Sequence, residues 1–229
     1  MEFVVVGTPD EGATLRLDYR AFAYAGKFVI GAPGKAALYT GDGSPAAPEW
    51  TPETTLPASV DPDVFAHDVL AAVSFSPDRT DPECCRLRYV TVHAARRGEG
   101  LGPRLITRTV EWLADAGYER VRIAVNNPFA YEALYKCGFA YTGETTGIAE
   151  LELARPAARP ADEHGDAEQY RSGLSVFRER DEGLSDPERR FLDARLGGEG
   201  GEDVGDGGDD GDDSRYNPRA DPPEIVEHG

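Results

Sequence analysis

The stretch from Tyr89 to Arg104 constrains the fold of this chain more than any other part of the sequence. It begins as a β-branched strand, continues through a turn with glycine at every second position, and leads into an amphipathic helix, Pro103–Ala116. Because glycine has no Cβ, the N–H groups of such a turn and of the helix N-terminus can approach a ligand closely and form a cradle for an anion. The order of strand, glycine turn and helix therefore predicts an α/β fold with a phosphate-binding site at the turn.

Charge around this turn supports the same interpretation. The chain has a net charge of −18, yet arginines gather beside the glycines. A polyphosphate is a ligand that the rest of the surface would repel and that this positive cluster would attract. The turn lacks the last glycine of a dinucleotide fingerprint, because Pro103 stands there, and no Gly-Lys-Ser/Thr of a P-loop is present. The glycines are Gly98, Gly100 and Gly102, and the arginines are Arg96, Arg97, Arg104 and Arg108.

The excess of acidic residues is concentrated in the C-terminal third of the chain. Residues 1–155 carry 21 acids and 15 bases, whereas residues 156–229 carry 21 acids and 9 bases. Such a surface disfavours nucleic acid and anionic membranes as partners. With three lysines against 21 arginines, the composition resembles that of proteins from extreme halophiles, which points to a halophilic archaeon. An ordinary acidic protein from a GC-rich genome is the alternative.

Cysteine usage and hydropathy indicate a cytoplasmic protein without a metal site. Cys84, Cys85 and Cys137 have no C-x-x-C spacing, so we expect free, buried thiols in a reducing compartment. Acidic residues interrupt any apolar N-terminal segment that could serve as a signal peptide. No apolar run approaches the ~18 residues that a membrane-spanning helix needs.

Hydrophobic patterning predicts a single folded domain over residues 1–155. Leu15–Tyr24 fits a strand and a helix equally well, and Gly41–Pro62 has the composition of a long surface loop. The remaining predicted elements are strands at Phe3–Val6, Val69–Phe75, Leu87–Val92 and Val121–Val125, a hairpin of Phe28–Ile30 with Ala36–Tyr39, a second helix at Pro128–Cys137, and closing strands at Phe139–Thr142 and Ile148–Leu153.

The pattern weakens beyond Arg155. Residues 156–196 predict a weakly helical extension, with short helices at Leu174–Phe177 and Phe191–Leu196 and a possible capping box formed by Ser185 and Glu188. Residues 197–229 predict a disordered acidic tail. Within it, the segment 199–213 holds eight acids and no base, and it offers too little apolar surface to offset the entropy of ordering.

Two motifs in the folded part resemble those of one known family. The spacing Arg97-x-x-Gly100-x-Gly102 resembles the R/Q-x-x-G-x-G/A signature of the GNAT superfamily of N-acetyltransferases, which grips the pyrophosphate of coenzyme A. The stretch Asn126–Phe139, which follows the predicted strand Val121–Val125, resembles the family's second motif, N-x-x-A…L-Y-x-x-x-G-F. The order of strands, helices and motifs is more specific than either motif alone.

This resemblance implies a mixed α/β GNAT fold, in which a central splayed sheet is flanked by helices. It also implies an enzyme, an N-acyltransferase that transfers an acetyl group from acetyl-CoA to an amine of a small molecule or peptide. No metal is required in such a reaction. By the same resemblance, the residues expected to bind the pyrophosphate are Arg97, Gly98, Gly100, Gly102 and Arg104.

Further site residues are implied in the same way. The backbone of Val90 and Val92 would pair with the pantetheine arm like an added strand, and Asn127 would contact pantetheine. Tyr135 would protonate the departing thiolate of coenzyme A, if its helix aims the phenol into the splayed gap. The spacing from Asn127 to Tyr135 is one residue longer than the usual family pattern, and Tyr131 is the next candidate. The alternative for Tyr135 is a packing role on the helix face.

The general base and the acceptor are left open by the sequence. A glutamate that serves as base in some family members has no counterpart, because Arg122 or Ile123 falls at its position. The candidates are His93, which could instead be a polar cap, Glu99, a carboxylate from the N-terminal half, or water. A second hypothesis is a GNAT-like module that binds coenzyme A or a protein partner without catalysis.

Overall fold

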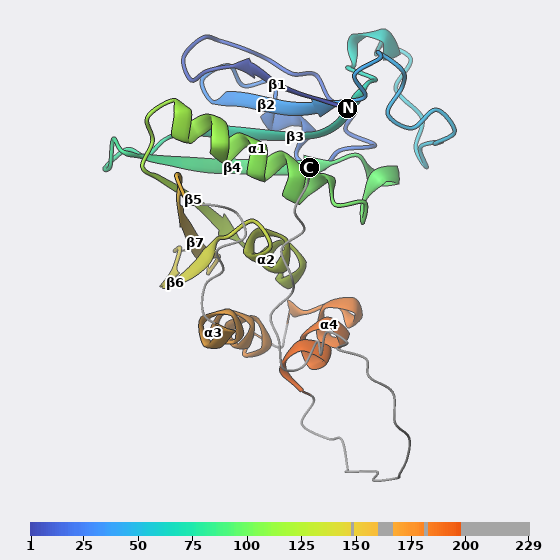
Figure 1. Cartoon of the computed structure of the whole chain (residues 1–229). Helices are drawn as coiled ribbons and strands as arrows, with labels where there is room; N and C mark the ends of the chain where they lie inside the picture. The colour runs from blue at the N-terminus through green and yellow to red at the C-terminus, as the bar shows by residue number, and fades with distance from the viewer. Residues whose placement is uncertain (148, 160–166, 181–182, 198–229) are drawn as a thin grey trace, which may run out of the picture.

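The computed structural model describes residues 1–147, 149–159, 167–180 and 183–197 and contains one seven-stranded sheet (Figure 1). The strand order is β1-β2-β3-β4-β5-β7-β6. All neighbouring strands are antiparallel except β4 and β5, which are parallel. The strands are β1 (Glu2–Gly7), β2 (Gly34–Tyr39), β3 (Val69–Pro77), β4 (Cys84–Val92), β5 (Arg120–Val125), β6 (Ala140–Thr145) and β7 (Leu151–Pro156).

Among the described residues, four α-helices accompany this sheet: α1 (Leu101–Asp115), α2 (Pro128–Tyr135), α3 (Ala167–Arg178) and α4 (Asp186–Leu196). Helix α1 begins two residues before the predicted start, because Gly100 takes a left-handed conformation with φ 73° and serves as its N-cap. Pro103 thus lies in the first turn, where its missing N–H leaves no hydrogen bond unmade. Within the described part of the chain, no helix has the length and apolar character needed to cross a membrane.

The two faces of the sheet are covered differently. Leu105 and Leu113 of α1 are buried against one face. On the opposite face, Phe22 and Phe28 pack with Val69 in a second apolar cluster that the segment 8–33 contributes. The predicted strand at Phe28–Ile30 is therefore wrong, since these residues belong to a packed connection between β1 and β2 that includes the short 3-10 helix η1 (Ala25–Lys27).

Lys35 of β2 fastens this connection. Its side chain is fully buried, and its ammonium group donates hydrogen bonds of 2.7, 2.7 and 2.8 Å to the carbonyl oxygens of Ala13, Ile30 and Pro33. All three ammonium protons are thereby used. Burial lowers the pKa of Lys35 from its ordinary value. The short apolar run Phe28–Ile30 thus belongs to a loop that Lys35 stabilises from inside.

The parallel pair β4–β5 is joined only at its beginning. The register contains three pairs, of which Arg86↔Arg122 is the last, and beyond it the two strands diverge (Figure 1). A splayed sheet was the expectation, and the structure confirms it.

The C-terminal extension packs on the domain. The side chains of Tyr170, Leu174, Phe177 and Leu192 are buried in the same apolar core as α2. Ser185 and Glu188 form the predicted capping box at the start of α4. Both helices are longer than the short helices predicted there, because their inward faces pack against the domain. The boundary at Arg155 stays a prediction, and residues 198–229, with most of the predicted acidic tail, lie outside the described residues.

Candidate active site

A cleft of about 320 Å³ opens where β4 and β5 part. Its walls come from β4, β5, α1 and α2. This is the gap that the splayed sheet was expected to provide. The residues that line it are Tyr24, Arg88, Tyr89, Val90, Val92, Gly102, Ile106, Ile123, Ala124, Val125, Asn126, Asn127, Ala130, Ala133, Leu134 and Glu150.

The β4 wall presents backbone groups to this cleft. The N–H of His93, just beyond the strand, donates to the carbonyl oxygen of Leu70 in β3, at 2.9 Å. Successive residues of a strand point their N–H and C=O groups to alternate sides. Thr91 therefore bonds toward β3, whereas the backbone groups of Val90 and Val92 face the gap. An extended ligand chain could pair there as an additional strand would.

The glycine turn lies at the end of the same wall. Gly98 and Gly100 have positive φ angles of 84° and 73°, which only glycine adopts without strain. Gly102 in the first turn of α1 lines the cleft, and a Cβ added there would lie 3.6 Å from Cγ2 of Val92. The backbone thus comes close to any ligand that follows β4 into the turn.

Only two of the four arginines at this turn are free to meet a ligand. Arg96 pairs with Glu99 and also donates to the carbonyl oxygen of Ala46 at 2.8 Å. Arg108 pairs with Glu111 at 3.2 Å. The guanidinium groups of the other two arginines contact no polar side chain among the described residues. They are Arg97 and Arg104.

Asn127 shapes the opposite wall. Its Oδ1 accepts a hydrogen bond of 2.8 Å from the N–H of Ala130, which caps the N-terminus of α2. Asn127 and Ala130 both line the cleft, as expected for the start of the second motif.

The same helix does not bring Tyr135 into the cleft. Ala130, Ala133 and Leu134 form the cleft-facing side of α2. Tyr135 is 1% exposed, and its ring centroid lies 4.5 Å from that of Tyr170 in α3. Because each residue turns an α-helix by ~100°, the one additional residue in the motif places Leu134 at the cleft. The prediction that α2 aims Tyr135 into the gap is therefore wrong.

Tyr131 has the same orientation as Tyr135, one helical turn earlier. Its hydroxyl donates to the carbonyl oxygen of Tyr170 at 3.1 Å, and burial raises the pKa of this phenol above its ordinary value. It does not line the cleft. Both tyrosines of α2 thus pack against α3.

The two sequence candidates for a base also lie away from the cleft. His93 is 7% exposed, and its ring contacts those of Phe22 and Trp50 at centroid distances of 5.2 and 4.9 Å. Its Nδ1 accepts from the N–H of Ala95 at 3.2 Å, so it caps the 3-10 helix η3 (Ala94–Arg96). Burial lowers the pKa of His93. Glu99 is engaged with Arg96.

Tyr24 and Glu150 line the cleft, although the motifs did not indicate them. Tyr24 precedes η1 with a positive φ of 59°, an uncommon conformation for a non-glycine residue, and its ring lies 5.5 Å from that of Tyr89 in β4. Glu150 reaches the cleft from the end of the β6–β7 connection. Neither Tyr24 nor Glu150 belongs to a motif, so no signal in the sequence could have identified them.

Comparison with known proteins agrees with this geometry. Residues 38–139 match the family model described as "Acetyltransferase (GNAT) family". This segment makes up less than half of the chain, and it contains the cleft walls of β4, α1, β5 and α2. The seven-stranded mixed sheet with its flanking helices is the GNAT fold. A comparison with curated proteins gives no match.

Several solved structures are also similar to the chain. An N-acetyltransferase from Staphylococcus aureus has 14% identity and a TM-score of 0.38, over 55% of this chain and 68% of that one. A ribosomal-protein-alanine N-acetyltransferase from Brucella melitensis has 13% identity and a TM-score of 0.38, over 54% and 68%. An acetyltransferase from Thermus thermophilus has 20% identity and a TM-score of 0.34, over 40% and 59%.

Proposed function

We propose that this protein is an N-acetyltransferase that transfers an acetyl group from acetyl-CoA to an amine. The observation that carries the proposal is the position of the cleft, which runs from the glycine turn along the open edge of β4 to the far side of the sheet. A ligand with a phosphate end and an extended arm fits such a path.

The residues present fit coenzyme A. The N–H groups of the turn from Gly98 to Gly102, together with Arg97 and Arg104, would hold the pyrophosphate. The backbone of Val90 and Val92 would pair with the pantetheine arm, and Asn127 would contact it from the other wall. When bound, acetyl-CoA would supply the acetyl group as a reactive thioester. The N–H groups of β4 that face the gap would stabilise negative charge on a carbonyl oxygen placed there.

Proton transfer then needs groups inside the cleft. Tyr24 and Tyr89 bring the two phenols that line it, and we propose them, in place of Tyr135, as candidates for the acid that protonates the leaving sulfur. Glu150 lines the cleft as well and is the candidate for the base that takes a proton from the amine. Water is the alternative base.

The decisive experiment separates binding from transfer. Calorimetry should show that coenzyme A binds, and an assay of thiol release should show acetyl-CoA consumption that depends on an added amine. Binding without release across a broad panel of amines would favour the alternative, a non-catalytic CoA-binding or protein-interaction module. Failure to bind coenzyme A would overturn the proposal altogether.

Two further proposals concern the setting in which the enzyme works. The acidic, lysine-poor composition supports an origin in a halophile, and affinity for coenzyme A should then survive molar KCl, where the Debye length is only ~3 Å. A steep, monotonic loss of affinity with salt would contradict this.

The three free, buried cysteines suit a reducing compartment, so we place the protein in the cytoplasm.

A further inference from the structure

A second cavity adjoins the cleft and shares two of its residues. It has a volume of about 770 Å³ and lies between the 8–33 segment and the β3–β4 hairpin. Arg88 and Tyr89 line both this cavity and the cleft. It therefore extends the cleft on the side away from α1, where the acceptor would enter.

The charge of the second cavity differs from that of the protein as a whole. Its lining includes two carboxylates, of which Asp78 is paired with Arg86, while Arg86 also pairs with Glu152. Hydrogen bonds from Arg86 and Thr80 hold the pKa of Asp78 well below its ordinary value. The remaining carboxylate is Asp10. The lining also contains three further cationic side chains, so its positive charges outnumber its negative ones. They are Lys27, Arg79 and Arg88.

Arg88 is the cation best placed to act on a ligand in both spaces. Its Nε donates to the hydroxyl of Ser76 at 2.8 Å, which fixes the direction of the side chain. Its two terminal nitrogens make no other polar contact with a described residue. A guanidinium held in this way matches the two oxygens of a carboxylate or phosphate.

We infer that the acceptor is an amine that also carries an oxyanion, a carboxylate or a phosphate. The oxyanion would bind Arg88 in the second cavity, with Lys27 and Arg79 nearby, and the amine would reach the cleft on the side of Glu150. In the transfer, the acceptor nitrogen gains a bond to the acetyl carbon as the carbon–sulfur bond breaks, and the nitrogen loses one proton while the sulfur gains one. The inference rests on the proposed function.

The test compares acceptors that differ by a single charge. The first pair, Ala-Glu-amide and Ala-Gln-amide, is matched in size and tests recognition of a carboxylate. The second pair, phosphoethanolamine and ethanolamine, tests recognition of a phosphate. With the wild-type protein and acetyl-CoA, we expect kcat/KM to be at least about ten-fold higher for the anionic member of one pair, as a charge-assisted hydrogen bond would give. The pair that shows the preference identifies carboxylate or phosphate as the group recognised.

Variants assign this preference to the second cavity. Arg88→Gln should remove most of the preference and leave the Kd for coenzyme A unchanged. Arg190→Gln, on the exposed face of α4, changes the net charge equally and should retain the preference. Amine-dependent transfer without any preference for an anionic acceptor, or a preference that Arg88→Gln retains, would overturn the inference and leave the transferase intact. Absence of both CoA binding and transfer would instead overturn the proposed function and this inference with it.

Discussion

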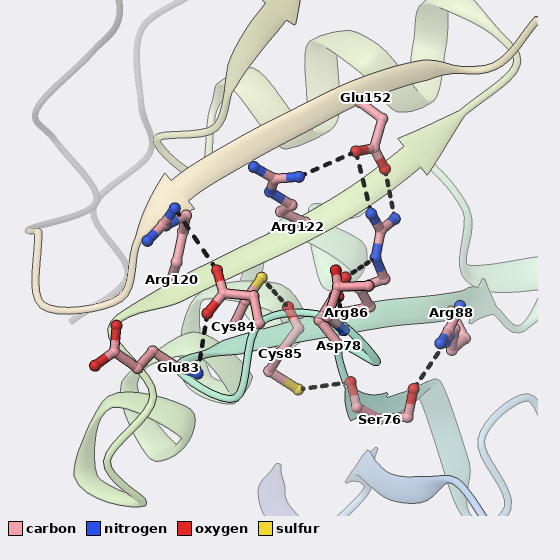
Figure 2. Close-up of polar contacts among 12 residues, drawn as sticks. Ser76, Asp78, Glu83, Cys84, Cys85, Arg86, Arg88, Arg120, Arg122 and Glu152 are labelled. Atoms are coloured by element: carbon pink, nitrogen blue, oxygen red, sulfur yellow. Dashed lines mark hydrogen bonds and ion pairs between the residues drawn. The ribbon is translucent and has the colours of Figure 1, made fainter. Parts of the chain in front are cut away.

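Arg86 of β4 and Glu152 of β7 form an ion pair across β5, at the last point where β4 and β5 are joined (Figure 2). Arg86 Nη2 lies 3.2 Å from Glu152 Oε2, and Nη1 of Arg122 lies 3.6 Å from the same carboxylate. Three strands are thereby tied together below the cleft. The ion pair therefore lies where the sheet begins to splay.

Glu152→Gln should therefore destabilise the protein. The change leaves Arg86 and Arg122 close together without their shared carboxylate, whose side chain is only 8% exposed. We expect a loss of roughly 1–3 kcal/mol in the free energy of unfolding, measured by urea denaturation. Glu111→Gln is the matched control, because its pair with Arg108 is exposed and should change stability by less than ~0.5 kcal/mol. Equal effects of the two changes would contradict the role of the ion pair.

Gly102→Glu should block coenzyme A without unfolding the protein. A carboxylate in the first turn of α1 suits the helix dipole but would stand where the pyrophosphate is expected. We expect the Kd for coenzyme A to rise at least about ten-fold, or ~1.4 kcal/mol, with an unchanged Tm. Gly102→Ala is the control, since its Cβ meets Val92 at an ordinary contact distance. Undiminished affinity in Gly102→Glu would show that the phosphates bind elsewhere.

Tyrosine substitutions should separate acid catalysis from packing. Tyr24→Phe or Tyr89→Phe should lower kcat by ~10²–10⁴-fold while the Kd for coenzyme A stays the same. Tyr135→Phe should keep kcat near the wild-type value, because its ring packs on Tyr170. The measurement is kcat under conditions in which chemistry limits the rate. A large loss of kcat in Tyr135→Phe, at normal Tm and CoA affinity, would assign the proton to Tyr135 after all.

Helices α3 and α4 should be required for a stable domain, whereas the acidic tail should not. A chain that ends at Leu196 should keep the Tm and the CoA affinity of the full chain. A chain that ends at Arg159 should lose much of its Tm, because it uncovers Tyr131 and Tyr135. Gly173→Ala tests the docking of α3 directly, since a Cβ there would lie 2.2 Å from the Tyr131 hydroxyl. An unchanged Tm in the shorter chain would support a domain that ends near Arg155.

The pair of Glu132 and Arg195 should make stability depend on pH. Burial alone would raise the pKa of Glu132, but hydrogen bonds from Arg195 and Lys136 outweigh it and lower the pKa below its ordinary value. A lowered folded-state pKa gives a stabilisation that is fully present above the unfolded value of ~4.3 and is lost as pH falls through the folded value. The Tm difference between wild type and Arg195→Gln should thus be larger at pH 7 than at pH 3. A constant difference would contradict it.

Local sequence patterns determined the glycine turn, helix α1 and the start of helix α4. Glycines at Gly98 and Gly100 are needed for positive φ angles, and they mark the turn without knowledge of the fold. The apolar periodicity of α1 and the capping box at Ser185 are equally local signals, and both are present in the structure. The family resemblance followed from motifs of this kind, because they encode backbone geometry at fixed spacing.

Tertiary structure decided the features that depend on distant partners. Phe28 and its neighbours look like a strand, but they form a loop in which Phe28 packs in an apolar cluster and the carbonyl oxygen of Ile30 accepts a hydrogen bond from Lys35. A shift of one residue in α2 turns Tyr135 away from the cleft and Leu134 toward it. Only the packing of α3 against α2 shows which side of this helix faces the cleft. Tyr24 and Glu150 reach the cleft from segments more than 100 residues apart in the sequence, so chain folding alone brings them to one site.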